Sequence, residues 1–72
     1  MIQVTFDKQF YNITQGRDAP DPRIIDADNV CLHEGWATFE KYVPVEGEKW
    51  KDSLFVEAIR LEAIESMVRV DP

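Results

Sequence analysis

The sequence predicts an all-β fold: a small antiparallel barrel, or a curled sheet, of five or six strands. The chain has 72 residues, enough for one small domain spanning residues 1–72. Short runs that alternate apolar and polar residues, rich in β-branched and aromatic side chains, recur along it. Residues that favour turns, chiefly Gly, Pro, Asn and Asp, separate these runs. Together the three observations favour a series of strands joined by turns.

An N-terminal hairpin is the first predicted element. Residues 1–6 alternate apolar and polar side chains, as in a half-buried strand. We expect residues 7–8 to turn the chain into a second short strand over residues 10–13. The apolar side chains of the first strand then share one face of the sheet: Ile2, Val4 and Phe6.

Residues 15–22 form the longest predicted loop. Pro20 and Pro22 lack an amide proton and Gly16 adds conformational freedom, so regular structure is excluded there. In a domain of this size, such a loop is either a plain connector or a place for binding contacts. Residues 23–26 follow as a short strand or an extended lead-in to the next one.

A second hairpin is predicted in the middle of the chain. Its strands are residues 29–33 and 36–43, with the turn at residues 34–35, and Pro44 ends the pairing before a charged loop over residues 45–52. Neither face of the second strand is uniformly apolar, so the strand is either partly covered on both sides or offers an aromatic face for binding. One face holds Trp36, Thr38, Glu40 and Tyr42, and the other holds Ala37, Phe39, Lys41 and Val43.

The C-terminal residues 53–70 carry conflicting signals. Several of them are good helix formers, and polar residues at the start could cap a helix, but the apolar positions do not form one helical stripe. The β-branched ends and the β-rich context favour two strands, over residues 54–59 and 67–70, around a tight turn. The alternative is an α+β fold in which residues 53–68 form a C-terminal helix beside an antiparallel sheet.

The composition argues against several classes of protein. Eight Lys and Arg against fourteen Asp and Glu give a net charge of −6, which argues against direct binding of nucleic acid or of a membrane surface. No apolar run approaches the roughly 18 residues that a membrane span needs, and no signal peptide is evident. Cys31 is the one cysteine, so we expect no internal disulfide and a reducing, cytoplasmic location.

Few residues are suited to catalysis or metal binding. Cys31 and His33 lie two apart, on one face of a strand, but zinc would need two further ligands and only carboxylates are available. We therefore expect a buried cysteine beside a partly exposed histidine.

Asp26 and Asp28 resemble the start of a calcium-binding loop. Cys31 and Ala37 occupy the positions at which such a loop requires Gly and Glu, so a turn is favoured. The sequence thus predicts no enzyme, no cofactor and no metal site.

Acidic and aromatic residues are the more informative feature. Residues 18–35 hold five carboxylates against Arg23, directly before Trp36. In one interpretation the carboxylates steer the approach of a basic partner surface and the aromatic residues anchor it. In the alternative, the acidic surface is solvated and only keeps the domain soluble. Trp50 either folds back over one end of the barrel or is a further exposed anchor. The candidate partner-binding residues are Asp18, Asp21, Asp26, Asp28, Glu34, Trp36, Tyr42 and Trp50.

These features predict a small acidic interaction module that binds a larger protein with a basic surface and modulates or inhibits it. In size and acidity the chain is similar to the compact inhibitors that phages encode against host systems that handle nucleic acid. The alternative is a structural or assembly subunit that completes its small core by forming a homo-oligomer or by adding a strand to a partner's sheet. Edge strands at residues 1–6 and 67–70 would support that alternative.

Overall fold

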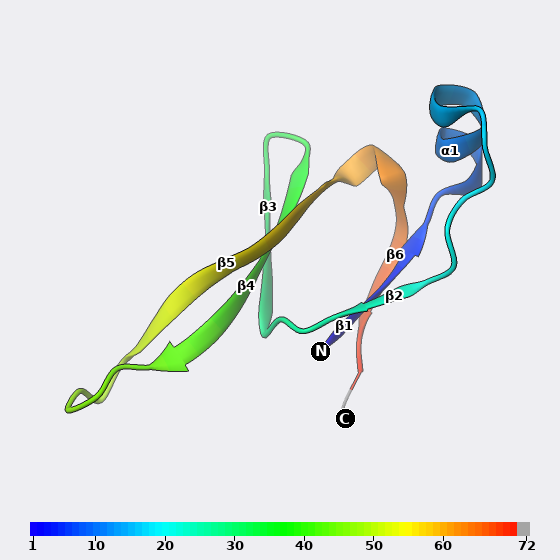
Figure 1. Ribbon diagram of the computed structural model, residues 1–72. Helices are drawn as coiled ribbons and strands as arrows, with labels where there is room; N and C mark the ends of the chain where they lie inside the picture. Colours follow the sequence, from blue (N-terminus) through cyan, green and yellow to red (C-terminus); the bar gives the residue numbers. More distant parts are fainter. Residues whose placement is uncertain (71–72) are drawn as a thin grey trace.

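The computed structural model describes residues 1–70, and over these residues the protein is mostly β, with six antiparallel strands in two three-stranded sheets and one short helix (Figure 1). One sheet has the strand order β2-β1-β6 and the other has the order β3-β4-β5. In chain order the elements are β1 (Ile2–Phe6), α1 (Lys8–Gln15), β2 (Arg23–Ile25), β3 (Asn29–His33), β4 (Trp36–Pro44), β5 (Lys51–Arg60), the 3-10 turn η1 (Leu61–Ala63) and β6 (Ile64–Arg69).

The prediction of a fold dominated by antiparallel strands is confirmed, but no closed barrel is detected over residues 1–70. In the second sheet, β3 and β5 each pair only with β4, so the outer edges of this sheet stay open. The C-terminal part forms strand, turn and strand, as the sequence favours, and the alternative of a helix over residues 53–68 is wrong. The 3-10 turn η1 makes the corner that carries the chain from β5 in one sheet to β6 in the other.

The predicted N-terminal hairpin is wrong, because the residues that follow β1 form helix α1. The carboxylate of Asp7 accepts a hydrogen bond from the backbone N–H of Phe10 at 2.7 Å and so caps the first turn. Gly16 ends the helix with φ of 64°, a left-handed conformation that glycine adopts without steric cost. Asp7 and Gly16 are the residues of the sequence that mark the two ends of this helix.

A single cluster of buried side chains joins the two sheets. β1 contributes its alternate residues on one face, as predicted, while β4 contributes Ala37 and Phe39 from the face assigned to them. Phe39 and Val4 are the largest fully buried side chains among the described residues. The whole cluster consists of Ile2, Val4, Phe6, Ile25, Ala27, Ala37 and Phe39.

The molecule is elongated, with extents of 50 × 28 × 14 Å. The far part of the β4–β5 hairpin accounts for much of this length, because it projects beyond the rest of the fold at the end opposite α1 (Figure 1). We call residues 41–54 the distal hairpin. Within residues 1–70 no helix has the length and hydrophobicity needed to cross a membrane.

The capping contact of α1 yields a stability prediction. Asp7→Ala removes the side chain that satisfies the N–H of Phe10, so we expect the free energy of unfolding to fall by about 1 kcal/mol. Urea denaturation followed by tryptophan fluorescence measures it. The control is Asp21→Ala, an exposed loop substitution that should change stability by less than about 0.5 kcal/mol. Equal stability of the two variants would contradict the capping role.

Candidate functional site

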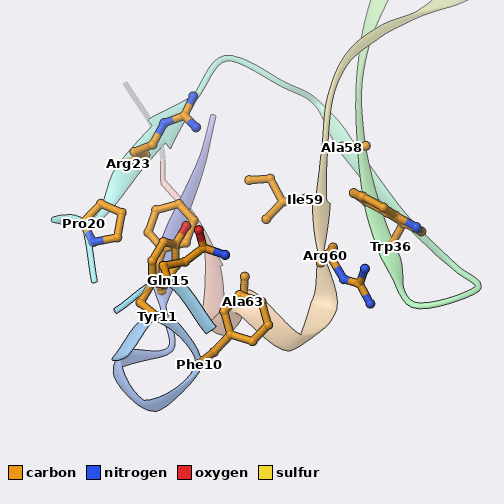
Figure 2. Close-up of a pocket in the computed structure, with 11 residues that line it drawn as sticks. Phe10, Tyr11, Gln15, Pro20, Arg23, Trp36, Ala58, Ile59, Arg60 and Ala63 are labelled. Atoms are coloured by element: carbon orange, nitrogen blue, oxygen red, sulfur yellow. The ribbon is translucent and has the colours of Figure 1, made fainter. Parts of the chain in front are cut away.

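An open groove of about 330 Å³ lies between α1 and the C-terminal end of β5. Figure 2 shows Tyr11 and Pro20 on one side, Trp36 and Arg60 on the other, and the side chain of Ile59 pointing into the space between them. Elements from both sheets, from the helix and from the loop before β2 contribute to its walls. The lining residues are Phe6, Phe10, Tyr11, Gln15, Pro20, Arg23, Trp36, Ala58, Ile59, Arg60 and Ala63.

Two aromatic residues of α1 form the helical wall of the groove. Tyr11 packs against the buried ring of Phe6, with ring centres 5.6 Å apart and planes at 81°, an edge-to-face arrangement. Phe10 lies edge-to-face against Tyr11 at 5.8 Å and 78°. Phe6 therefore fixes the ring of Tyr11, and Tyr11 in turn limits where Phe10 lies, so the wall is preformed.

Trp36 and Arg60 form the opposite wall. They are direct partners in the register of β4 and β5, and the guanidinium carbon of Arg60 lies 5.6 Å from the ring centre of Trp36. This distance allows a cation–π interaction. Trp36 remains 43% exposed, so the stacked pair presents apolar ring and charged edge to solvent together. The nearest carboxylate oxygen to Arg60, on Glu62, is 3.9 Å away and so outside hydrogen-bond distance.

A forked ion pair involves Arg23, the residue of β2 that lines the groove. Arg23 donates two hydrogen bonds to the carboxylate of Glu57, each 3.1 Å long. Because Arg23 belongs to β2 and Glu57 to β5, the pair ties the two sheets together. Two hydrogen bonds from one guanidinium to one carboxylate are the arrangement that these groups favour. Both side chains are partly exposed, so the pair serves mainly to position the two strands.

Three of the predicted acidic residues lie on segments that bound this groove. Asp18 and Asp21 are exposed on the loop that supplies Pro20, and that loop lacks regular structure, as predicted. Glu34 is exposed at the turn directly before β4 and has a φ of 49°. Within residues 1–70, neither Asp18 nor Asp21 forms an ion pair. Both carboxylates therefore stay without an ion-pair partner among the described residues.

The other two predicted acidic residues have structural partners. Asp26 accepts a hydrogen bond of 2.6 Å from Lys41, and Asp28 accepts one of 2.8 Å from the backbone N–H of Tyr42. Both contacts join the bend between β2 and β3 to β4. The hydrogen bond and the charge of Lys41 hold the pKa of Asp26 below its usual range, and the same contacts raise the pKa of Lys41.

Tyr42 and Trp50 lie on the distal hairpin and do not line the groove. Trp50 sits in the loop between β4 and β5 and is 55% exposed. Of the two alternatives for Trp50, the one in which it covers one end of a barrel is therefore wrong, because the loop that carries it projects away from the core (Figure 1). The structure thus divides the eight predicted residues among three places: the groove, the bend between β2 and β3, and the distal hairpin.

Cys31 and His33 are both exposed on β3. The expected burial of Cys31 is wrong, because β3 is an edge strand and this residue lies opposite Thr38 on the face of the sheet turned away from the core. The expectation of an exposed His33 is confirmed. Over residues 1–70 no three His, Cys, Asp or Glu side chains gather in a way that could hold a metal ion.

Most residues of the groove carry no signal in the sequence that marks them as a site. Phe10 and Tyr11 were assigned to a strand, and the caps at Asp7 and Gly16 are the signal that would have placed them on a helix. Arg60 carries no local signal at all, because its contact with Trp36 depends on how two strands pair.

Comparison with known proteins finds no relative of this chain. The chain matches no protein-family model, and neither the curated proteins nor the solved structures contain a significant match to it.

The contact between Asp26 and Lys41 leads to a prediction about pH. A carboxyl whose pKa is lowered by folding stabilises the folded state above its unfolded pKa of about 3.9, and this contribution disappears as the pH falls through the lower folded value. We expect Lys41→Met to lower the urea midpoint slightly at pH 7 and to match the wild type once the pH falls below the lowered pKa of Asp26 in the folded protein, where the carboxyl is protonated. Lys49→Met, which removes a loop lysine, is the control. A difference that persists undiminished in acid would contradict the assignment.

Proposed function

We propose that this protein is a small acidic interaction module that binds a larger protein through the groove between α1 and β5. The observation that carries the proposal is the groove itself, which gathers Tyr11, Trp36 and Arg60 from three different elements, and an excess of exposed apolar side chains supports it. Over residues 1–70, eleven large hydrophobic side chains are exposed, while the core holds eight hydrophobic residues, three of them alanines. Exposed apolar surface of this kind marks interaction sites in soluble proteins.

The groove has the composition of a protein-binding centre. Trp, Tyr and Arg are the residues that most often dominate binding energy in interfaces, and Trp36, Tyr11 and Arg60 all line it. The edge-to-face packing of Tyr11 and the stacking of Arg60 on Trp36 hold these side chains in place before a partner arrives. Preformed anchors lose little conformational entropy on binding, which favours affinity. The recess between them suits an apolar side chain of a partner.

The acidic rim favours a partner with a basic surface. Asp18, Asp21 and Glu34 lie on the two segments that also supply Pro20 and Trp36 to the groove. The two arginines that line it are engaged within the chain, Arg23 by Glu57 and Arg60 by Trp36. With a net charge of −6, the long-range field attracts a basic surface. Docking there would cover basic residues that otherwise contact phosphates, which is how a compact inhibitor would block a host protein that handles nucleic acid.

The groove's role is tested by comparing its tryptophan with the one on the distal hairpin. We expect Trp36→Ala to weaken binding of the partner captured from the native lysate by roughly 30-fold or more, the loss typical of a central anchor. Trp50→Ala removes an equally large exposed ring outside the groove and should change affinity by less than about fivefold. Titration calorimetry with the purified partner provides both constants. The reverse ranking would assign binding to the distal hairpin and overturn the proposal.

Electrostatic steering makes a separate kinetic prediction. The association rate with the partner should fall about tenfold or more between low salt and about 0.5 M salt, while the dissociation rate changes little. Asp18→Asn combined with Asp21→Asn should lower the rate at low salt and flatten its salt dependence. Lys8→Gln, an exposed substitution that makes the protein more acidic, is the control and should not slow association. A rate independent of salt in the wild type would rule out steering by the acidic rim.

A further inference from the structure

Strand β5 has one fully open edge. Its ten residues, Lys51–Arg60, pair with β4 on one side, and no other strand of the described chain pairs with the other side. Long open edges offer unpaired N–H and C=O groups to another strand, and folded proteins usually shorten or cover them. Here the middle of the edge carries Leu54, Phe55 and Val56, all exposed, with Phe55 at 68%.

The register with β4 shows which side chains of β5 share a face. Ala37 and Lys41 lie on the core-facing side of β4, so their partners on β5, Ile59 and Leu54, lie on that side too. The bulge between the two halves of β5 keeps both halves in phase with β4. The core-facing side of β5 therefore consists of Asp52, Leu54, Glu57 and Ile59, and the outer side of Lys51, Ser53, Phe55, Ala58 and Arg60.

We propose that two copies of this chain pair antiparallel through β5, about a two-fold axis, and so join two three-stranded sheets into one six-stranded sheet. In this register Leu54 lies opposite Ile59 of the second copy, Phe55 lies opposite Ala58 and Ser53 lies opposite Arg60. Each pair joins side chains from the same face, as a continuous sheet requires. The two-fold axis repeats every pair, so Leu54 and Phe55 of each edge are covered, while Val56 lies opposite Glu57 at the centre.

Charge selects this register over its neighbours. A shift of the second strand by two residues keeps side chains of the same face opposite each other. It places Lys51 opposite Arg60, so two like-charged pairs form about the two-fold axis. Shifting the strand by two more places Asp52 opposite Glu57, with the same consequence. Of these three registers, only the proposed one places no like charges opposite each other, and it sets a neutral serine against Arg60. Charge therefore favours this alignment over the two shifted ones.

The groove supports the same arrangement. Ala58, Ile59 and Arg60 form the β5 side of the groove, next to the open edge. A second copy in the proposed register brings its Ser53, Leu54 and Phe55 alongside these three residues, and the side chain of its Leu54 enters the recess between Ile59 and α1. The dimer thus fills the site that the proposed function assigns to a larger partner. That competition rests on the proposed function, whereas the dimer itself does not.

The first experiment measures the mass of the wild-type protein by sedimentation equilibrium across the micromolar range. We expect a monomer–dimer equilibrium that strengthens as salt rises from about 0.02 M to about 0.15 M, because each copy carries −6 and the screening of their repulsion favours association. This salt dependence is opposite to that expected for a basic partner. A monomer throughout would overturn the inference and leave the proposed function standing.

The second experiment uses matched edge variants. Leu54→Lys should weaken the dimer about tenfold or more, since it places a charge opposite Ile59. Leu32→Lys is the control, because Leu32 is similarly exposed, at 61% against 53% for Leu54, but lies on the opposite edge strand, β3. Circular dichroism confirms that both variants fold. A dimer that survives Leu54→Lys, or that Leu32→Lys disrupts equally, would overturn the inference.

The third experiment tests the register. Ser53→Asp places a carboxylate opposite Arg60 and Ser53→Lys places a second cation there, each twice in the dimer. We expect the aspartate variant to dimerise about tenfold more tightly than the lysine variant at about 0.15 M salt. In the register shifted by two residues Ser53 would instead lie opposite Ala58, and the two variants would then differ little. Equal dissociation constants would therefore reject the proposed alignment.

Discussion

The shared core is the constraint on which the rest of this structure depends. One cluster, centred on Phe39 of β4 and Val4 of β1, receives side chains from both sheets. A chain of 72 residues cannot bury enough apolar surface to support two cores, so neither sheet has a hydrophobic interior of its own. The sheets are therefore held together by a few buried residues, and every element far from that cluster depends on local contacts for its position.

Polar contacts at the periphery show how those elements are held. Asp7 caps α1, Asp28 accepts the backbone N–H of Tyr42, and Arg23 reaches across from β2 to Glu57 on β5. Each contact is partly or fully exposed and contributes little energy by itself. Their value lies in geometry, because they fix where the helix, the bend and the second sheet lie relative to the core. Two of them act at the groove, because Asp7 caps the helix that forms one wall and Arg23, which pairs with Glu57, lines the groove.

Local patterns made much of the fold predictable, and long-range contacts account for what was missed. The hairpin at residues 29–43 follows from alternation on either side of a two-residue turn, which are short-range signals. Helix α1 was missed because the apolar residues after Asp7 fit a short strand as well as a helix. The groove could not be predicted, because the pairing of Trp36 with Arg60 and the salt bridge between Arg23 and Glu57 join residues far apart in the chain. Aromatic residues alone did not distinguish Trp36, in the groove, from Trp50, on the distal hairpin.

The exposed apolar residues link the two proposals. Six of the eleven exposed large hydrophobic residues over residues 1–70 fall between Trp36 and Val56, on the β4–β5 hairpin and the loop that joins its strands. Burying them in the monomer would require the hairpin to fold back on the core, yet β4 and β5 pair along their full length and so form a stiff, twisted ribbon. Another molecule must therefore cover this surface if it is to be covered at all. Because the open edge of β5 and the groove lie side by side, a second copy and a larger partner would compete for one region. Rising salt would strengthen binding of the second copy, whose charge repels this chain, and would weaken binding of a basic partner.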